Sequence, residues 1–348
     1  QTICCGNLRP ACEVLTRYLK EAAHERGHEP DEIRGYRGGY LPLLRREIEE
    51  GLRSGAVKVV VATNALELGI DIGHLDVAVL VGYPGAQASF WQRAGRVGRR
   101  GKASLALLVA RSDPIDQYLA LHPEYLFGAP RERLGLDPDN LVILSEHVKC
   151  AAFELPFREA ELADPSAPFG RAPHVREVLG YLAEESGLLL ERNGTWHWTA
   201  DAYPAQDVTL AGNDPDNVLV LDVETKQAIG EIDREGSITS VHEGAIYQVE
   251  GETWIVETFD YANRRAYVKR VDSDYFTEAE TDTELRVLRL ERRRTRPRAE
   301  GGAEDCSVWA GEVHVTTLAT QYKKVRFYTR EDVGNEAIHL PPEELDTQ

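Results

Sequence analysis

The chain has 348 residues, of which 42% are hydrophobic and 28% are charged, the composition of a globular protein of two or three domains. No apolar run approaches the roughly 20 residues that a membrane span needs, and no signal peptide opens the chain, so we expect neither a membrane nor a secreted protein. The five cysteines form no C-x-x-C pair, which favours reduced thiols and a cytoplasmic location.

The net charge of −18 is unevenly distributed. Residues 1–111 hold 16 Lys/Arg and 12 Asp/Glu, whereas the remaining 237 residues hold 24 and 46. The acidic bulk argues against non-specific coating of nucleic acid but allows a local basic track. Methionine is absent and Gln1 leads directly into an apolar run, so we expect a fragment of a longer protein; unusual codon usage with processing is the alternative.

Residues 1–111 are predicted to alternate strands and helices. Apolar residues at helical spacing predict one helix over 11–22 and another over 43–52. The Val/Leu-rich runs are typical of parallel strands covered on both faces, so we expect an α/β fold with a RecA-like open parallel sheet. The expected strands are 2–5, 33–37, 57–62, 77–81 and 105–109.

Residues 112–204 are predicted to hold connecting helices and a winged-helix unit. An apolar face over 174–185 predicts a helix, and Asn193-Gly194 between two β-prone runs predicts a hairpin. Residues 205–348 show short strands with turns, as in a β-rich, small barrel-like domain. The basic run 292–298 is predicted to be a flexible loop.

The sharpest chemical signal is the segment 92–100, which holds four arginines and two glycines. On a helix, Arg96 and Arg99 would lie on one face, and guanidinium groups suit phosphate oxygens. A solvated basic helix is the alternative. It normally carries acidic residues nearby, but positions 88–102 contain no Asp or Glu.

A second signal follows the expected strand 57–62. Thr63 and Asn64 stand just past its carboxyl end, and Gly69-Ile70-Asp71 comes after a short helical stretch. Open α/β sheets bind ligands at this edge, although an ordinary strand–loop–helix junction has the same pattern.

These segments resemble motifs V and VI of superfamily 2 helicases, and residues 1–111 resemble the second RecA-like domain of that superfamily. Motif VI reads Q-x-x-G-R-x-G-R and motif V reads T-x-x-x-x-x-G-I-D. The matching residues are Gln92, Gly95, Arg96, Gly98 and Arg99 for motif VI, and Thr63, Gly69, Ile70 and Asp71 for motif V. Further segments, among them 82–85 and 113–118, are similar to the MrfA-type bacterial DNA-repair helicases, which end in a four-cysteine zinc module that this chain does not show.

The resemblance implies ATP and Mg²⁺ as cofactors, bound mainly by a first RecA-like domain. No G-x-x-x-x-G-K-[ST] loop occurs here, so we expect no ATP turnover by this chain alone. The implied catalytic residues are Arg96 and Arg99, which would contact the γ-phosphate, and Gln92. The implied ATP-binding residues are Gly69, Asp71, Gln92, Arg96 and Arg99. The implied DNA contacts are Arg37, Gly38, Thr63 and Asn64.

Weaker candidates lie further along the chain. Trp196 and Trp198 alternate on one expected strand and suit base stacking, although half-buried packing produces the same pattern. The run 292–298 suits a phosphate backbone, with a solvated loop as the alternative. The ten histidines show no ligand spacing, so we expect no metal site.

Together these features predict the C-terminal part of an ATP-dependent DNA helicase or translocase that acts in DNA repair. The expected partners are DNA, as single strand and duplex junction, ATP and a repair nuclease, and the expected state is a monomer. An RNA helicase and a non-catalytic nucleic-acid-binding scaffold are the alternatives. The paired arginines of motif VI argue against the scaffold, which has no use for γ-phosphate contacts.

Overall fold

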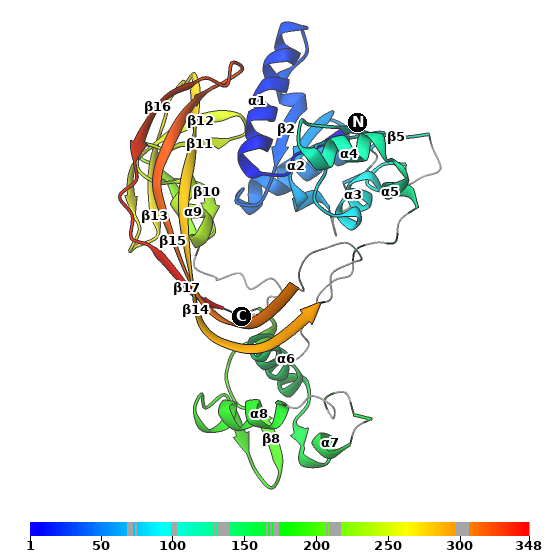
Figure 1. Cartoon of the computed structure of the whole chain (residues 1–348), viewed down its shortest axis with the longest axis vertical. Helices are drawn as coiled ribbons and strands as arrows, with labels where there is room; N and C mark the ends of the chain where they lie inside the picture. The colour runs from blue at the N-terminus through cyan, green and yellow to red at the C-terminus, as the bar shows by residue number, and fades with distance from the viewer. Residues whose placement is uncertain are drawn as a thin grey trace. The chain divides into compact units, whose positions relative to one another are not determined.

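A computed structural model describes residues 1–67, 72–73, 75–98, 103–128, 130, 132, 140–164, 166–167, 169, 174–206, 208, 217–296 and 306–347. The chain forms two compact units. Unit 1 comprises Gln1–Glu132 and Pro215–Gln348, and unit 2 comprises Arg133–Asp214. The predicted fold class is confirmed, since unit 1 holds a parallel α/β sheet and a β-rich part, and unit 2 holds a winged helix (Figure 1).

The N-terminal part of unit 1 is a five-stranded parallel sheet of order β2-β3-β1-β4-β5. Its strands are β1 (Thr2–Cys5), β2 (Ile33–Tyr36), β3 (Val59–Ala62), β4 (Val77–Val81) and β5 (Leu105–Val109). The five predicted strands are thus present; β3 begins two residues later than expected and β2 ends one residue earlier. Because all five strands are parallel, their carboxyl ends lie at one edge of the sheet.

Helices cover the two faces of this sheet unequally. The helices of this part are α1 (Arg9–Glu25), α2 (Pro42–Ser54), α3 (Gln87–Ala94), α4 (Pro114–Leu121) and α5 (Glu124–Phe127). Residues of α2, α3, α4 and α5 pack into the core on one face, whereas α1 packs on the other through Cys12 and Ala23. Proline opens α1 and α2, where its missing N–H costs nothing, and Gly55 with φ of 81° ends α2.

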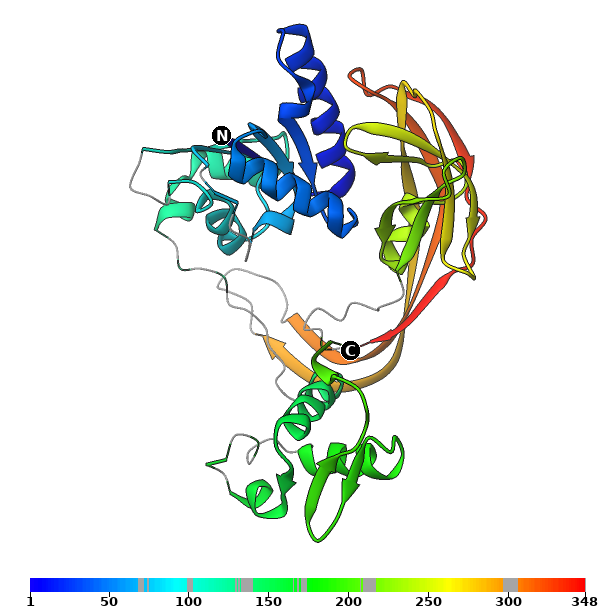
Figure 2. The same ribbon diagram turned by 180° about the vertical axis from the view of Figure 1, so that it is seen from behind.

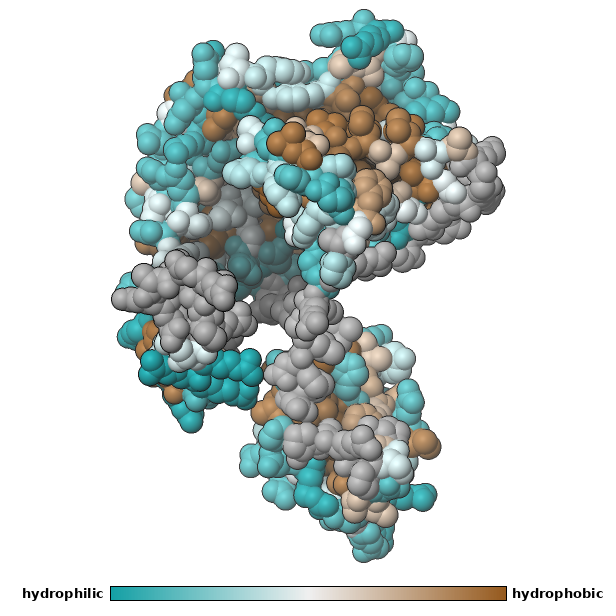
Figure 3. Space-filling model, turned by 45° about the vertical axis from the view of Figure 1, so that its right-hand side comes forward, coloured by the Kyte–Doolittle hydropathy of each residue, from teal (hydrophilic) through white to brown (hydrophobic). Residues whose placement is uncertain are grey.

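The face that carries α1 is uncovered over β4 and β5 within the described residues. Leu105, Leu107 and Val109 of β5 are exposed, and they lie beside the half-buried Val77, Val79 and Val81 of β4. Figure 3 shows the resulting gathering of hydrophobic residues on one face of this unit. Apolar surfaces of this kind mark contact sites in many proteins.

The C-terminal part of unit 1 consists of two further sheets. One is a sheet of order β10-β9-β13-β12-β11, and the other pairs β14, β15, β16 and β17. The elements are β9 (Val218–Asp222), β10 (Ala228–Ile232), α9 (Arg234–Ser240), β11 (Ile246–Val249), β12 (Glu252–Asp260), β13 (Arg265–Arg270), β14 (Tyr275–Arg296), β15 (Cys306–Arg326), β16 (Asp332–Ala337) and β17 (Glu343–Thr347). Residues 292–296, predicted as a flexible loop, belong to β14; that prediction is wrong because they pair in register with β15.

The β-rich part packs directly on α1. Val14 and Tyr18 of α1 form a small core with Phe276, Val325 and Phe327. The Tyr18 hydroxyl also accepts a hydrogen bond of 2.7 Å from the Tyr328 backbone N–H. Figures 1 and 2 show β11 and β12 beside α1 from both sides. One helix therefore serves the cores of both the parallel sheet and the β-rich part.

Unit 2 is a small helical domain with a three-stranded sheet of order β6-β8-β7. Its elements are α6 (Leu141–Glu154), β6 (Phe157–Arg158), α7 (Glu159–Ala163), α8 (Val175–Glu184), β7 (Leu189–Glu191) and β8 (Thr195–Trp198). The predicted hairpin is confirmed: β7 pairs with β8, and both Asn193 and Gly194 adopt positive φ.

Among the described residues, no helix combines the length and apolar character that crossing a membrane requires. No cluster of three or more His, Cys, Asp or Glu side chains suited to a metal ion occurs in the described part of the chain.

Candidate functional site

The candidate site lies at the edge where the strands of the parallel sheet end. Asn7 follows β1, Thr63 follows β3 and Tyr83 follows β4. The Asn7 side-chain N–H donates a hydrogen bond of 2.9 Å to the Tyr83 carbonyl, which ties two of these loops together. Polar groups at this edge are placed where open α/β sheets bind their ligands.

Glu67 connects the loop after β3 to α3. Its carboxylate accepts hydrogen bonds from the Ser89 hydroxyl at 2.8 Å and from Arg93 Nε at 3.0 Å. Arg93 also donates to Asn7 Oδ1 at 2.9 Å, and the Glu67 carbonyl accepts from Arg96 Nη2. The side chains of Arg93 and Glu67 are only 7% and 13% exposed, so this network is largely shielded from water.

This network was not predicted from the sequence. The absence of acidic residues over 88–102 suggested arginines without carboxylate partners, but Glu67 supplies one from a separate segment. Spacing along the chain gives no indication of such a contact. Arg93 and Glu67 therefore join the site as positioning residues that fix the Arg96 segment against the strand ends.

The expectation that Arg96 and Arg99 share a helix face is wrong for Arg96. The helix α3 ends at Ala94, and Gly95 follows as its C-cap. A Cβ atom on Gly95 would lie 2.9 Å from the Trp91 carbonyl oxygen, and Gly98 has a φ of 76°, so both glycines serve the turn that follows the helix. Arg99 lies outside the described residues, as do Gly69, Ile70 and Asp71 of motif V.

The other predicted residues of this edge differ in exposure. Thr63 is 5% exposed, and its hydroxyl accepts a hydrogen bond from the Ala65 N–H at 3.5 Å, which begins a short 3₁₀ turn. Asn64 and Gln92 are exposed, whereas Arg96 is 8% exposed. The structure therefore brings Thr63, Asn64 and Arg96 to the same edge through Glu67, with Asn64 and Gln92 accessible to a ligand.

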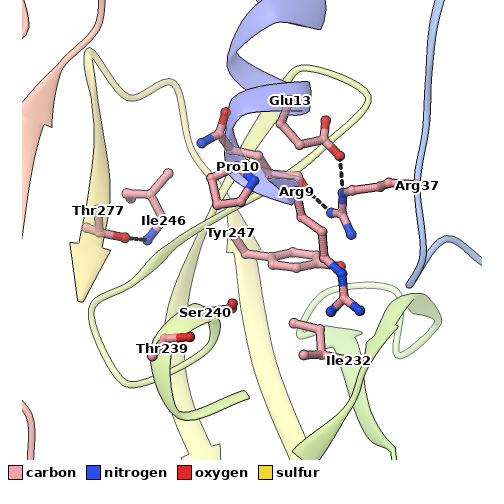
Figure 4. Close-up of a pocket in the computed structure, with 11 residues that line it drawn as sticks. Arg9, Pro10, Glu13, Arg37, Ile232, Thr239, Ser240, Ile246, Tyr247 and Thr277 are labelled. Atoms are coloured by element: carbon pink, nitrogen blue, oxygen red, sulfur yellow. Dashed lines mark hydrogen bonds and ion pairs between the residues drawn. The ribbon is translucent and has the colours of Figure 1, made fainter. Parts of the chain in front are cut away.

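Arg37 is buried and engaged by neighbouring groups. Its side chain is 3% exposed, and its Nε donates a hydrogen bond of 2.6 Å to the carboxylate of Glu13, which is 2% exposed. Its Nη2 donates to the Gln248 carbonyl at 2.7 Å, and its guanidinium lies over the rings of Tyr40 and Tyr247. Glu13 and the β-rich part occupy the hydrogen-bonding groups of Arg37 (Figure 4), and its predicted DNA contact remains a prediction.

Glu13 is as fully engaged as Arg37. Besides Arg37, its carboxylate accepts hydrogen bonds from the Tyr40 hydroxyl at 2.7 Å and from the Gly251 N–H at 3.1 Å. Burial, with the nearby Glu13 charge, raises the pKa of Tyr40 well above its usual range, so its hydroxyl remains a donor. The pair lines a cavity of about 60 Å³ between α1 and the β-rich part, shown in Figure 4.

The β-rich part holds the end of β2 and the loop that follows it, on both sides of Arg37. The Glu231 N–H donates to the Gly39 carbonyl at 2.8 Å, and a Cβ atom on Gly39 would lie 2.4 Å from the Glu231 carbonyl oxygen. Glu250 accepts from Arg34 Nε at 2.5 Å and from the Gly35 N–H at 2.8 Å. Gly38 is half-buried within this loop, and its predicted DNA contact remains a prediction.

The two tryptophans of unit 2 are placed differently from each other. Trp196 is 8% exposed and packs in the core with Leu179 and Phe157, so the prediction that it stacks on a base is wrong. Trp198 is half-buried and meets Phe153 edge to face, with ring centroids 6.2 Å apart.

Comparisons with known proteins agree with this fold. The helicase conserved C-terminal domain matches residues 2–101, and the winged helix domain of the ATP-dependent helicase HRQ1 matches residues 136–212. The ATP-dependent helicase YprA of Bacillus subtilis is 44% identical over all of this chain and 45% of its own length. HRQ1 of Saccharomyces cerevisiae is 32% identical over 98% of this chain and 31% of its own length.

A crystal structure of the DUF1998 helicase MrfA bound to DNA and AMPPNP superposes with a TM-score of 0.79 and 40% identity, over the whole chain and 45% of MrfA. The chain therefore carries a helicase conserved C-terminal domain and a winged helix domain of the HRQ1 type, and over its whole length it is similar to the helicase MrfA. It spans less than half the length of YprA and MrfA.

Proposed function

We propose that this chain is the second motor half, with accessory domains, of an ATP-dependent DNA helicase or translocase that acts in DNA repair. The observation that carries the proposal is the Glu67 network, which fixes Arg93 and Arg96 of the arginine segment at the strand-end edge of the sheet. We infer that in this position the segment would face the nucleotide of a partner RecA-like domain. The relatives named as ATP-dependent helicases, and the MrfA structure with DNA and AMPPNP, support the same role.

The proposed nucleotide chemistry divides between two domains. The first RecA-like domain holds ATP and most of the Mg²⁺ coordination, and this chain contributes Arg96, Arg99, Gln92, Gly69 and Asp71. An arginine directed at the γ-phosphate stabilises the charge that develops during phosphoryl transfer. Arg96 keeps its position through the Glu67 carbonyl, so its guanidinium is oriented before the domains close.

The proposed DNA contacts at this edge are Thr63 and Asn64, with Gly38 on the neighbouring loop. Asn64 is exposed, and both Asn64 and Thr63 lie one short turn from Glu67. A DNA strand in this position would contact the loop after β3, whose Glu67 also holds the nucleotide-facing arginines. DNA binding and ATP hydrolysis would then be coupled through this loop. We also propose that the intact protein works as a monomer in the cytoplasm, together with a repair nuclease.

A titration of this chain with single-stranded DNA, duplex DNA and single-stranded RNA tests the assigned substrate. We expect DNA to bind more tightly than RNA, with a salt slope of only a few units, since each neutralised phosphate of duplex DNA adds about 0.9. Asn64→Ala should weaken DNA binding by roughly two- to tenfold, the value of one hydrogen bond.

Asn335→Ala is the matched control, because Asn335 is an exposed asparagine on β16 of the same unit. Tighter binding of RNA than of DNA would contradict the assigned substrate. An Asn64→Ala affinity equal to that of Asn335→Ala would remove Asn64 from the DNA site.

A further inference from the structure

The strands β14 and β15 form a hairpin whose far end lies away from any core. They pair from Tyr275 with Arg326 to Arg296 with Cys306, and they stand out as the long orange strands of Figure 1. We define the distal hairpin as residues 289–295 of β14 and 307–311 of β15. Every residue of the distal hairpin is exposed except Gly311, which is half-buried.

The distal hairpin is strongly basic in an otherwise acidic chain. It carries Arg289, Arg292, Arg293 and Arg294 and one carboxylate, Glu291, which lies 4.0 Å from Arg289; a second carboxylate, Glu312, pairs opposite Arg289 at its edge. The chain as a whole has a net charge of −18. Four neighbouring guanidinium groups repel one another unless an anion lies between them, so their concentration indicates a polyanionic ligand.

One face of the distal hairpin also presents an aromatic ring beside an apolar hollow. Arg293 stands opposite Trp309, and Leu290 stands opposite Gly311, so these four residues share a face. Trp309 is 48% exposed and Leu290 is 54% exposed. Trp309, Leu290 and Gly311 line a groove of about 510 Å³ together with Val287 and Val313, and Arg292 and Glu291 also border it.

The geometry of the hollow depends on Gly311 and Trp309. A Cβ atom on Gly311 would lie 2.0 Å from the Arg289 carbonyl oxygen, so no larger residue fits the floor of the groove without moving the backbone. The Arg293 guanidinium lies 4.9 Å from the centre of the Trp309 ring. It covers part of the ring and stays beside the groove, where it can reach a phosphate.

We propose that the distal hairpin binds single-stranded nucleic acid, with one base stacked on Trp309 in the groove and Arg292 and Arg293 on the flanking phosphates. Aromatic side chains beside a basic track are the usual means of holding an unpaired strand. That the bound strand is DNA rests on the proposed function. That the hairpin binds a single strand rests on the chemistry of the hairpin alone. Duplex DNA, anionic lipid or an acidic protein would engage the arginines but would leave the groove without a role.

Anisotropy titrations of the full chain with labelled oligothymidine test this site. We expect Trp309→Ala to weaken binding by at least about fivefold, since stacking on one base contributes upwards of about 1 kcal/mol. Trp309→Phe should retain most of the affinity. The double variant Arg292→Ala with Arg293→Ala should lower the salt slope by roughly 1.4, because each contact to a single strand contributes about 0.7.

Lys269→Ala is the matched control, since it removes one exposed charge from β13 of the same unit. Unchanged oligothymidine affinity in Trp309→Ala, with its circular dichroism spectrum as in the parent chain, would overturn the proposal. Loss of phosphatidylserine-vesicle binding in the arginine variant, with oligothymidine binding intact, would overturn it in favour of a lipid surface. In either case an affinity loss in Asn64→Ala would leave the proposed function standing, so the two failures are distinguishable.

Discussion

Replacing Arg37 with alanine is expected to lower the free energy of unfolding of unit 1 by about 3–5 kcal/mol, the usual cost of removing one partner from a buried ion pair. The loss arises because Glu13 would remain 2% exposed without its guanidinium partner. The Gln248 carbonyl would lose its donor at the same time. Urea denaturation followed by circular dichroism measures the change.

Arg53→Ala is the matched control for this experiment. Arg53 pairs with Glu50 on α2, and their side chains are 42% and 72% exposed. Surface pairs of this kind contribute about 0–1 kcal/mol, so the control should remain close to the parent chain. Replacing both partners, as in Glu13→Leu with Arg37→Met, should restore part of the stability, because no unpaired charge remains buried.

The Arg37 experiment also separates an interface role from a DNA contact. If Arg37 contacted DNA, Arg37→Ala would lower DNA affinity and leave the unfolding free energy near that of Arg53→Ala. That result would contradict the interface described here. The expected result would show that Arg37 ties the loop after β2 to the β-rich part, beside the contact of Gly39 with Glu231 and that of Glu250 with β2.

In the full-length protein, Arg99→Ala and Arg96→Ala are each expected to reduce DNA-stimulated ATP hydrolysis by about 10³-fold or more, the contribution of an arginine that stabilises a transferring phosphoryl group. Arg96→Lys should lose most of the rate as well, since an ammonium group lacks the planar fork of a guanidinium. Steady-state phosphate release at saturating DNA is the measurement.

Arg26→Ala is the control for these variants, because Arg26 is an exposed arginine at the end of α1 in the same domain. Arg96 is 8% exposed, so its variants also need a melting temperature near that of the parent before the rates are compared. Near-parental turnover in a folded Arg96→Ala or Arg99→Ala would show that the arginine in question does not act on the nucleotide.

The parallel sheet was predictable because its signals are local. Runs such as Thr2–Cys5 and Val59–Ala62 identify strands directly, since strands buried on both faces must be apolar along their length. Leu105–Val109 is equally apolar, but the expectation that both its faces are covered is wrong, because Leu105, Leu107 and Val109 are exposed. The Asn193-Gly194 turn was predictable for a similar reason, because its positive φ angles restrict the residues that fit. Motif spacing likewise identified the edge of the sheet that carries Thr63 and Arg96.

Contacts between distant segments left no such signal. Arg37 and the carbonyl of Gln248 are 211 positions apart, and the sequence alone does not distinguish a buried arginine from an exposed one. Tyr36 and Tyr40 on either side of Arg37 were the available hint, since aromatic rings often flank a buried guanidinium. The carboxylate of Glu67 was missed in the same way, because its partners lie on α3.

The basic run of the distal hairpin was predicted as a flexible loop, although it is also compatible with a strand. The run 292–296 reads R-R-R-T-R, and its β-branched Thr295 and the preceding Val287, Leu288 and Leu290 are compatible with a strand. The charge of the run favoured a solvated loop over a paired strand. Trp196 is the opposite case, where an aromatic residue suited to stacking instead fills the core of a small domain.

The central claim is that this chain provides one half of a two-domain ATP-driven motor. Its most direct test is DNA-stimulated ATP hydrolysis, measured under the same conditions for the 348-residue chain and for the full-length protein. The account predicts turnover that depends on DNA in the full-length protein and none above background in the chain alone. DNA-stimulated turnover by the chain alone, or its absence from the full-length protein, would contradict it.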